Sequence, residues 1–218
     1  MSTEDYILND VTIRDISDKI GDLQNDFNQL TYSHLPVEKD GVYMGCISEN
    51  DIRCFDAKKS IVDYQYALEG FFVRQTDYWL DILEAFAQNN TNILPVLNTD
   101  NEYLGYVELS EIISLFNETP FLNEPGNILV IEKGFQDYSL SEISQIVESS
   151  NLHLLGLFVS KVENDLAQIT IKISPSSINE LIQTLRRYGY HVLSKHEEDS
   201  YNKNLKDRSK YLDKYLNI

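Results

Sequence analysis

SHLPVEKDGVYMGCISENDI at residues 33–52 and NILPVLNTDNEYLGYVELSEI at residues 92–112 are two copies of one pattern. The shared Leu-Pro-Val aligns at an offset of 59 residues, and the shared glycine, Gly45 or Gly105, aligns at an offset of 60. A unit repeated in this way buries its apolar face only against its twin. We therefore expect the two copies to pack on each other.

Each copy has the pattern of a helix, two strands joined by a polar turn, and a second helix. Three- and four-residue spacing of apolar residues predicts the first helix, on Ile20, Leu23, Phe27 and Leu30 in copy one and on Leu80, Leu83 and Ala87 in copy two. Proline suits the start of a strand, and a pair such as Asp40-Gly41 closes a hairpin. Residues 1–15 are expected to be an extended lead whose apolar residues between Tyr6 and Ile13 can add a short strand to copy one.

This element order, with Leu-Pro-Val and a Gly-x-x-Ser-x-x-Asp ending, resembles the CBS domain, and two copies in tandem resemble the pair called a Bateman module. The resemblance covers roughly residues 6–121. It implies an α/β (α+β) fold with pseudo-twofold symmetry, in which residues 1–123 hold repeat one at about 6–60 and repeat two at about 61–122. It also implies a regulatory module that usually forms a homodimer and has two clefts, commonly occupied by adenine nucleotides or adenosyl compounds.

Two prolines and a glycine between Thr119 and Gly126 predict a domain boundary. Residues 126–196 then have a strand, helix, strand, strand, helix, strand pattern, which predicts a ferredoxin-like (βαββαβ) domain. The alternation of residues 166–174 predicts a strand with one wet face. Behind a CBS pair this domain resembles an ACT domain, whose members often bind small effectors between two copies. The loop at Lys133-Gly134 lacks the Pro-Gly pair of that family's ligand loop.

Residues 197–218 are polar and then amphipathic, with Tyr201, Leu205, Leu212 and Leu216 near one face. We expect a C-terminal helix or tail that docks on its own protein or on a twin subunit. The full domain order resembles the acetoin-utilisation type of CBS protein.

The net charge of −17 falls mainly on the first domain. Residues 1–123 carry 7 Lys and Arg against 22 Asp and Glu, whereas residues 124–218 carry 11 against 13. A field of this sign repels polyphosphate backbones and anionic membranes, so we expect neither nucleic acid nor a membrane as a partner.

Targeting signals and metal motifs are not found in the sequence. The N-terminus lacks the basic start of a signal peptide, and no apolar run approaches the ~20 residues of a membrane span. The two cysteines, Cys46 and Cys54, have no metal or redox spacing. The chain is therefore expected to be cytoplasmic and to hold no metal.

Ser48 and Asp51 are the first candidate ligand-binding residues. In nucleotide-binding CBS repeats, a hydroxyl and a carboxylate at this spacing hold the ribose. The same pattern also caps a helix, which is worth about 1 kcal/mol. Copy two has Glu108 and Glu111 at these places, and although Glu111 can still accept from a diol, Glu108 would repel a phosphate. We expect the functional cleft to be the one served by Ser48 and Asp51.

Four further residues are candidates around the same ligand. Arg14 and Arg53 could face a monophosphate, and Tyr32 and His34 could stack on a base, although surface cations and packed rings are the ordinary alternatives. Because the domain is strongly acidic, a nucleoside, a monophosphate or an adenosyl compound is favoured over free ATP without a divalent cation.

The sequence contains no phosphate loop, no dinucleotide-binding fingerprint and no hydrolase motif, and it pairs no nucleophile with a base. We therefore expect a non-catalytic protein with no certain cofactor. One hypothesis is a sensor of an adenine nucleotide or adenosyl compound that passes its signal to a separate protein. The alternative is a scaffold whose degenerate clefts bind nothing and whose repeats serve only dimerisation.

Overall fold

The computed structural model describes residues 6–194. The chain divides into two compact units, Met1–Asn117 and Glu118–Ile218. The predicted end of the first domain at residue 123 lies beyond this division. The reason is that helix α5 (Pro120–Asn123) packs within unit 2, where the ring of Phe121 meets the ring of Phe158 edge-on at 5.6 Å. The tail predicted at residues 197–218 lies outside the described residues.

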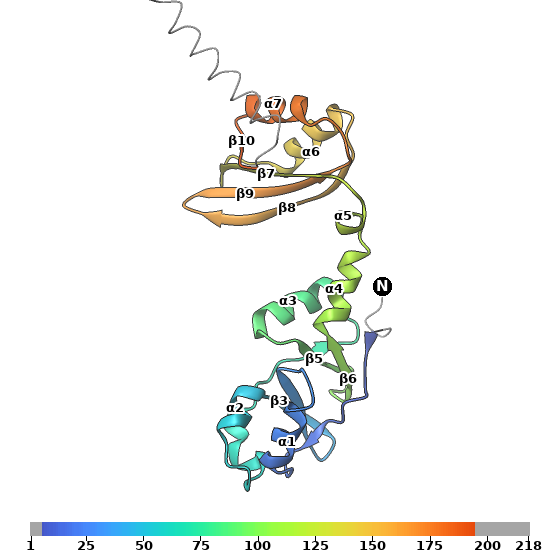
Figure 1. Ribbon diagram of the computed structural model, residues 1–218, viewed down its shortest axis with the longest axis vertical. Helices are drawn as coiled ribbons and strands as arrows, with labels where there is room; N and C mark the ends of the chain where they lie inside the picture. The colour runs from blue at the N-terminus through green and yellow to red at the C-terminus, as the bar shows by residue number, and fades with distance from the viewer. Residues whose placement is uncertain (1–5, 195–218) are drawn as a thin grey trace, which may run out of the picture. The chain divides into compact units, whose positions relative to one another are not determined.

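Unit 1 is built from two copies of one five-element pattern (Figure 1). Repeat one consists of β1 (Arg14–Asp15), α1 (Ile20–Phe27), β2 (His34–Lys39), β3 (Val42–Ser48) and α2 (Glu49–Cys54). After the 3-10 helix η2 (Ile61–Ala67), repeat two consists of β4 (Val73–Arg74), α3 (Trp79–Asn89), β5 (Ile93–Leu97), β6 (Tyr103–Glu108) and α4 (Leu109–Asn117).

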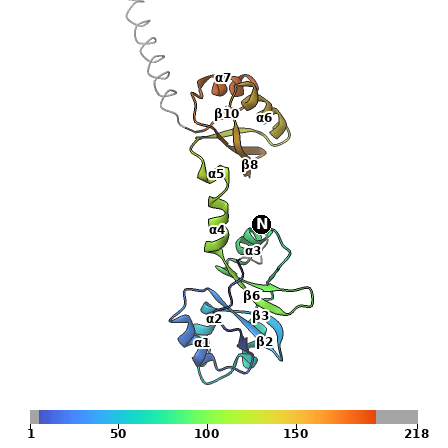
Figure 2. The ribbon, with the colours of Figure 1, turned by 90° about the vertical axis from the view of Figure 1, so that its right-hand side faces the viewer.

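The two sheets have the same topology. Each short strand pairs parallel to the first hairpin strand, and the hairpin strands pair antiparallel, giving the orders β1-β2-β3 and β4-β5-β6. The strands of the two repeats lie side by side in both views (Figures 1 and 2). The predicted fold class, with an internal duplication, is confirmed.

The segments that lead into the repeats cross to the opposite repeat. Leu8 exchanges two 2.8 Å backbone hydrogen bonds with Tyr106 of β6, and Glu69 exchanges two of the same length with Cys46 of β3. The prediction that the lead extends the sheet of repeat one therefore holds only for its end, at Arg14–Asp15. The exchange ties the two repeats into one body.

Two glycines make this exchange sterically feasible. A Cβ at Gly105 would lie 2.3 Å from the carbonyl oxygen of Leu8, and one at Gly45 would lie 2.9 Å from that of Glu69. Both glycines also have positive φ, at 146° and 139°, a region that side chains disfavour. The glycine shared by the two sequence copies is thus required by the crossing backbone.

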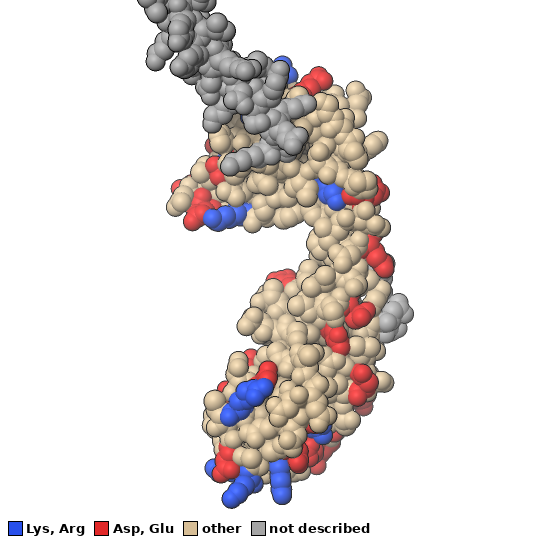
Figure 3. Space-filling view, viewed as in Figure 1, with Lys and Arg blue, Asp and Glu red and all other residues tan. Residues whose placement is uncertain are grey.

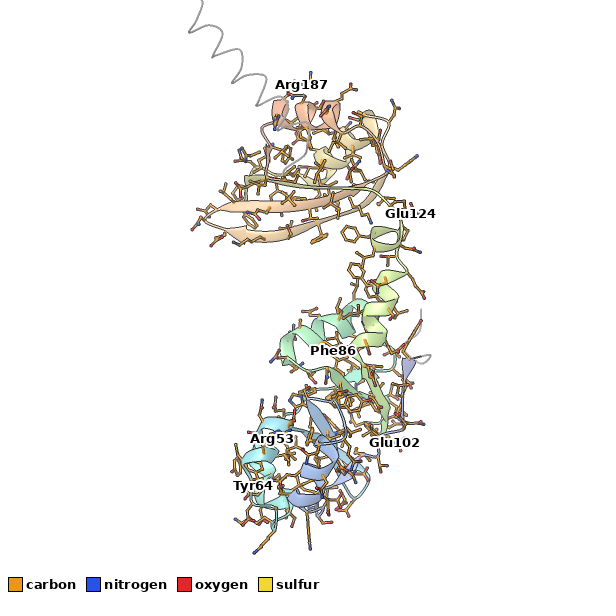
Figure 4. All side chains as sticks on the ribbon, in the orientation of Figure 1. Arg53, Tyr64, Phe86, Glu102, Glu124 and Arg187 are labelled. Atoms are coloured by element: carbon orange, nitrogen blue, oxygen red, sulfur yellow. The ribbon has the colours of Figure 1, made fainter. Side chains whose placement is uncertain are left out.

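The predicted apolar face of α3 is wrong at Leu80 and Ala87, whereas its third member, Leu83, packs against the core of repeat two. Leu80 is 58% exposed and Ala87 is also exposed, whereas Ile82 and Phe86 are buried (Figure 4 labels Phe86). Helix α3 carries two apolar stripes, and the one with Ile82 and Phe86 aligns with the buried stripe of α1 at the offset of 59. The sequence analysis selected the outer stripe.

Unit 2 confirms the ferredoxin-like prediction. Its elements after α5 are β7 (Asn127–Gly134), α6 (Leu140–Ser149), β8 (Leu154–Glu163), β9 (Leu166–Ile173), α7 (Asn179–Arg187) and β10 (His191–Val192). All pairs are antiparallel, in the order β10-β7-β9-β8. One face of β9 is buried in the core as predicted, at Ala167, Ile169, Ile171 and Ile173. The prediction that the other face is wet is wrong at Lys172, which is buried with its Nζ 5.8 Å from the centre of the Phe121 ring.

Candidate functional site

The ends of β2 and β3 direct one face of their sheet at repeat two. His34 lies opposite Ser48, and Pro36 lies opposite Cys46. Side chains alternate along a strand, so these four lie on the face opposite the core of repeat one. Cys46 is buried in the hydrophobic cluster of repeat two, which shows where this face points.

Ser33 and Asn92 mark the centre of the contact between the repeats. They are equivalent at the offset of 59, and each binds the other: Ser33 N donates to Asn92 Oδ1 at 2.8 Å, and Asn92 N donates to Ser33 Oγ at 3.2 Å. The two repeats are thus joined reciprocally at this point, with one junction on either side.

The first junction, around Ser48, is defined by His34, Cys46, Ser48, Asp51 and Thr91. Ser48 Oγ accepts from Asp51 N at 3.1 Å and donates to Asp51 Oδ2 at 2.8 Å, so Ser48 caps α2. Within residues 6–194, Asp51 Oδ1 makes no hydrogen bond or ion pair. Thus the capping role is shown, and one carboxylate oxygen is still able to accept from a ligand.

His34 is buried beside Ser48 and has polar neighbours on both sides of its ring. Its Nδ1 lies 2.8 Å from Ser33 Oγ and 3.1 Å from Thr91 Oγ1, and its Nε2 lies 3.4 Å from Glu69 Oε1. The ring also meets Phe71 edge-on at 5.2 Å. His34 is therefore held in place and borders the first junction.

The second junction is defined by Asp10, Tyr32, Tyr106 and Glu108. The Tyr32 hydroxyl donates to Glu108, the Tyr106 hydroxyl donates to Asp10, and the two hydroxyl oxygens lie 3.0 Å apart. The rings meet edge-on at 5.5 Å. Burial and then the bond to Glu108 raise the pKa of Tyr32, and burial and then the bond to Asp10 raise that of Tyr106. Both phenols stay neutral at pH 7 and occupy this junction.

Equivalent positions therefore differ between the junctions. Where the second has Tyr106, the first has the smaller Cys46, and where the second has Tyr32, the first has Thr91. Burial raises the pKa of Cys46 to about 12, so its thiol is also neutral. The first junction has small side chains where the second has two hydrogen-bonded rings.

Of the predicted site residues, only His34, Ser48 and Asp51 come together. Tyr32 belongs to the second junction. Arg14 pairs with Asp26 at 2.7 Å, and the Arg53 Nε donates to Glu49 at 3.0 Å (Figure 4 labels Arg53). The prediction that these cations could face a phosphate is unsupported, because both are engaged by carboxylates. Glu111 lies exposed in the first turn of α4.

The sequence analysis missed Asp10, Thr91 and Tyr106 as junction residues. Thr91 and Tyr106 could have been found by aligning the copies, because they correspond to Tyr32 and Cys46. The sequence also gave no sign that the Ser33 hydroxyl lies within hydrogen-bond distance of the His34 imidazole. That hydroxyl already accepts from Asn92 N, so the pair forms part of the contact between the repeats.

Unit 2 has an open surface depression of about 550 Å³ where β7 and β10 meet. Glu132, Lys133, Asp137 and His191 are among its lining residues. Lys133 Nζ lies 3.3 Å from Glu142 and 4.3 Å from the centre of the Tyr190 ring. The depression adjoins the loop after the first strand of this domain.

Residues 69–118 match the family model described as the CBS domain. The matched segment covers repeat two, and repeat one has the same elements, strand pairing and glycine. No curated protein sequence matches the chain.

Solved structures similar to the chain include proteins that contain CBS domains. A CBS domain pair/ACT domain protein from Thermotoga maritima has 19% identity and a TM-score of 0.49, over 54% of this chain and 98% of that one. CBSX2 in complex with AMP has 15% identity and a TM-score of 0.45, over 53% and 95%. The CBS domain of a bacterial CNNM/CorC family Mg²⁺ transporter in complex with ATP has 14% identity and a TM-score of 0.44, over 52% and 85%.

Neither a metal-binding cluster nor a membrane-spanning helix is found in the part of the chain that the structure describes. Within residues 6–194, no cluster of three or more His, Cys, Asp or Glu is placed to hold a metal ion. None of the helices in the same range has the length and hydropathy needed to span a bilayer.

Proposed function

We propose that unit 1 is a non-catalytic regulatory module that binds an adenine nucleotide or adenosyl compound at the first junction. The CBS match over residues 69–118 and the duplicated fold support a regulatory role. The proposal includes a homodimer, a cytoplasmic location, and a separate protein that receives the signal.

The observation that carries the proposal is the hydrogen bonding of the Asp51 carboxylate. Its Oδ2 accepts from Ser48 at 2.8 Å, which orients the carboxylate at the start of α2, and its Oδ1 makes no hydrogen bond or ion pair within residues 6–194. An oriented carboxylate can accept hydrogen bonds from the two hydroxyls of a ribose. Cys46 and Thr91, both buried, are smaller than the two tyrosines at the equivalent positions of the second junction.

The charges near the junction favour a ligand with few phosphates. Arg14 and Arg53 are both paired with carboxylates, and Glu69 adds a further carboxylate near His34. A triphosphate would meet uncompensated negative charge unless a divalent cation came with it. A nucleoside, a monophosphate or a cationic adenosyl compound fits better.

A melting screen tests this proposal. A ligand at 100 times its dissociation constant stabilises the native state by about 2.7 kcal/mol, which raises the melting temperature by several degrees in a protein of this size. We expect such a shift with adenosine, AMP or S-adenosylmethionine, its loss in Asp51→Asn, and its retention in the matched variant Glu111→Gln. A flat response for every compound contradicts the proposal.

A ligand-free scaffold is the second candidate, and the closed second junction favours it. Tyr32 and Tyr106 bind Glu108 and Asp10, so this junction already joins the repeats without a ligand. If the first junction behaves in the same way, the CBS pair serves only association. A chain that dimerises normally while the melting screen stays flat would establish this function.

A further inference from the structure

The outer surface of helices α3 and α4 differs from the equivalent surface of repeat one. In repeat one, a depression of about 260 Å³ between α1 and α2 is lined by Gln24, Phe27, Asn28, Ile52 and Arg53. At the offsets of 59 and 60, repeat two has Leu83, Phe86, Ala87, Ile112 and Ile113. The polar members of the set, the glutamine, the asparagine and the arginine, are thus all replaced by apolar residues.

Phe86 and Ile112 of this set are buried, whereas Ala87 and Ile113 are exposed and, with Leu80, form an apolar stripe. Leu80 is 58% exposed, Ile113 is 44% exposed, and Ala87 is exposed between them in sequence. The core beneath α3 is filled by Ile82 and Phe86, so the exposed residues are not part of it. An exposed apolar strip on a helix pair is typical of a surface that binds a partner helix.

The charged residues of α3 and α4 are all acidic: Asp81, Glu84 and Glu111. In Figure 3 the surface over α3 shows no Lys or Arg, and the nearest blue groups lie towards α2. Two copies of this surface facing each other would bring like charges together. A partner helix with basic flanks is therefore favoured over a second copy of the same surface.

The chain contains a segment with that chemistry. Residues 201–218 carry five Lys and Arg against two Asp, and Tyr201, Leu205, Leu212 and Leu216 recur at helical spacing. The 24 residues that follow Ser194 would span about 36 Å if helical, which is longer than α3. We propose that this C-terminal segment binds as an amphipathic helix to the acidic, apolar surface of α3 and α4 in a second copy of the chain.

Hydrogen exchange on the full-length protein tests the proposal. Docking should slow amide exchange in residues 201–218 by about tenfold or more. Leu80→Glu and Ala87→Glu, both at exposed positions, should return that segment to the rate of a free peptide. Asn28→Glu is the matched control, since Asn28 is the exposed equivalent of Ala87 on α1, and it should leave the protection unchanged.

A second measurement separates the surface from the fold. A labelled synthetic peptide of residues 199–218 should bind a chain ending at residue 196, more weakly at high salt and not at all with Leu80→Glu. Equal exchange of residues 201–218 in the wild type and in Leu80→Glu overturns the proposal. So does a dimer that Leu80→Glu dissociates while the C-terminal segment shows no protection in either protein.

Discussion

The two repeats of unit 1 share a backbone plan and differ in the side chains at their junctions. In both repeats a lead segment crosses to the other sheet over a glycine. The first junction has Cys46 and Thr91, and the second has Tyr106 and Tyr32, whose hydroxyls bind two carboxylates. A duplicated fold can therefore keep its symmetry in the backbone while one junction becomes structural and the other keeps a residue suited to a ligand.

Substitution of Gly45 and Gly105 tests the backbone arrangement that the two repeats share, and it should have the largest effect on stability. Gly105→Ala should destabilise unit 1 by about 3–5 kcal/mol, because the new Cβ meets the carbonyl of Leu8 and the backbone has positive φ. Gly45→Ala, with a 2.9 Å approach, should cost less. Urea unfolding measures both.

Gly41→Ala is the control for these variants. Gly41 has φ of 78° and nothing within 4 Å of a Cβ, so only backbone strain applies, at about 1 kcal/mol. Equal losses at Gly41 and Gly105 would show that the crossing segments do not hold the repeats together.

Alkaline pH should reveal the buried thiol of the first junction and the buried phenol of the second. Burial raises the pKa of Cys46 from 9.0 to about 12 and also raises that of Tyr106 above 10.0. Between pH 9 and about pH 12 the thiol of Cys46 is ionised in the unfolded chain but protonated in the folded chain. The free energy of unfolding is therefore unaffected below pH 9 and falls as the pH rises above it. In Cys46→Ala the fall should begin about one pH unit later, as followed by thermal melting. An onset unchanged by this substitution would contradict the buried thiol.

Removal of one tyrosine hydroxyl should sharpen the difference between the junctions. Tyr106→Phe removes the hydrogen bond to Asp10 and the contact with the Tyr32 hydroxyl, which keeps its bond to Glu108, and should cost about 1–2 kcal/mol. Tyr66→Phe, at a side chain that is 81% exposed, should change nothing. Chemical denaturation of the two variants side by side makes the comparison, and equal stabilities would remove the structural role of the second junction.

Ser48→Ala should have the smallest effect on stability, about 1 kcal/mol, from loss of the cap of α2. Its ligand affinity should fall by more than this, because the carboxylate of Asp51 loses its anchor. Calorimetry and unfolding on the same variant separate the cap from the ligand role. A variant that loses stability but binds normally would leave Ser48 as a cap only.

The sequence predicted the fold better than the site. The repeated Leu-Pro-Val and glycine gave the duplicated sheets because backbone register is local and periodic. The apolar face of α3 was misassigned because Leu80 and Ile82 both belong to apolar stripes, and only packing shows which one is inside. The pairing of Arg14 with Asp26 could not be predicted because it depends on tertiary structure, whereas Arg53 and Glu49 are a local i,i+4 pair. Asp10 joins Tyr106 across 96 positions, a contact that no local pattern reports.

Titration calorimetry with the adenosyl compound selected by the melting screen tests the central claim most directly. The account predicts one site per chain, with binding lost in Asp51→Asn and unchanged in Glu111→Gln. Two sites per chain, or full affinity in Asp51→Asn, would contradict the assignment of ligand binding to the first junction.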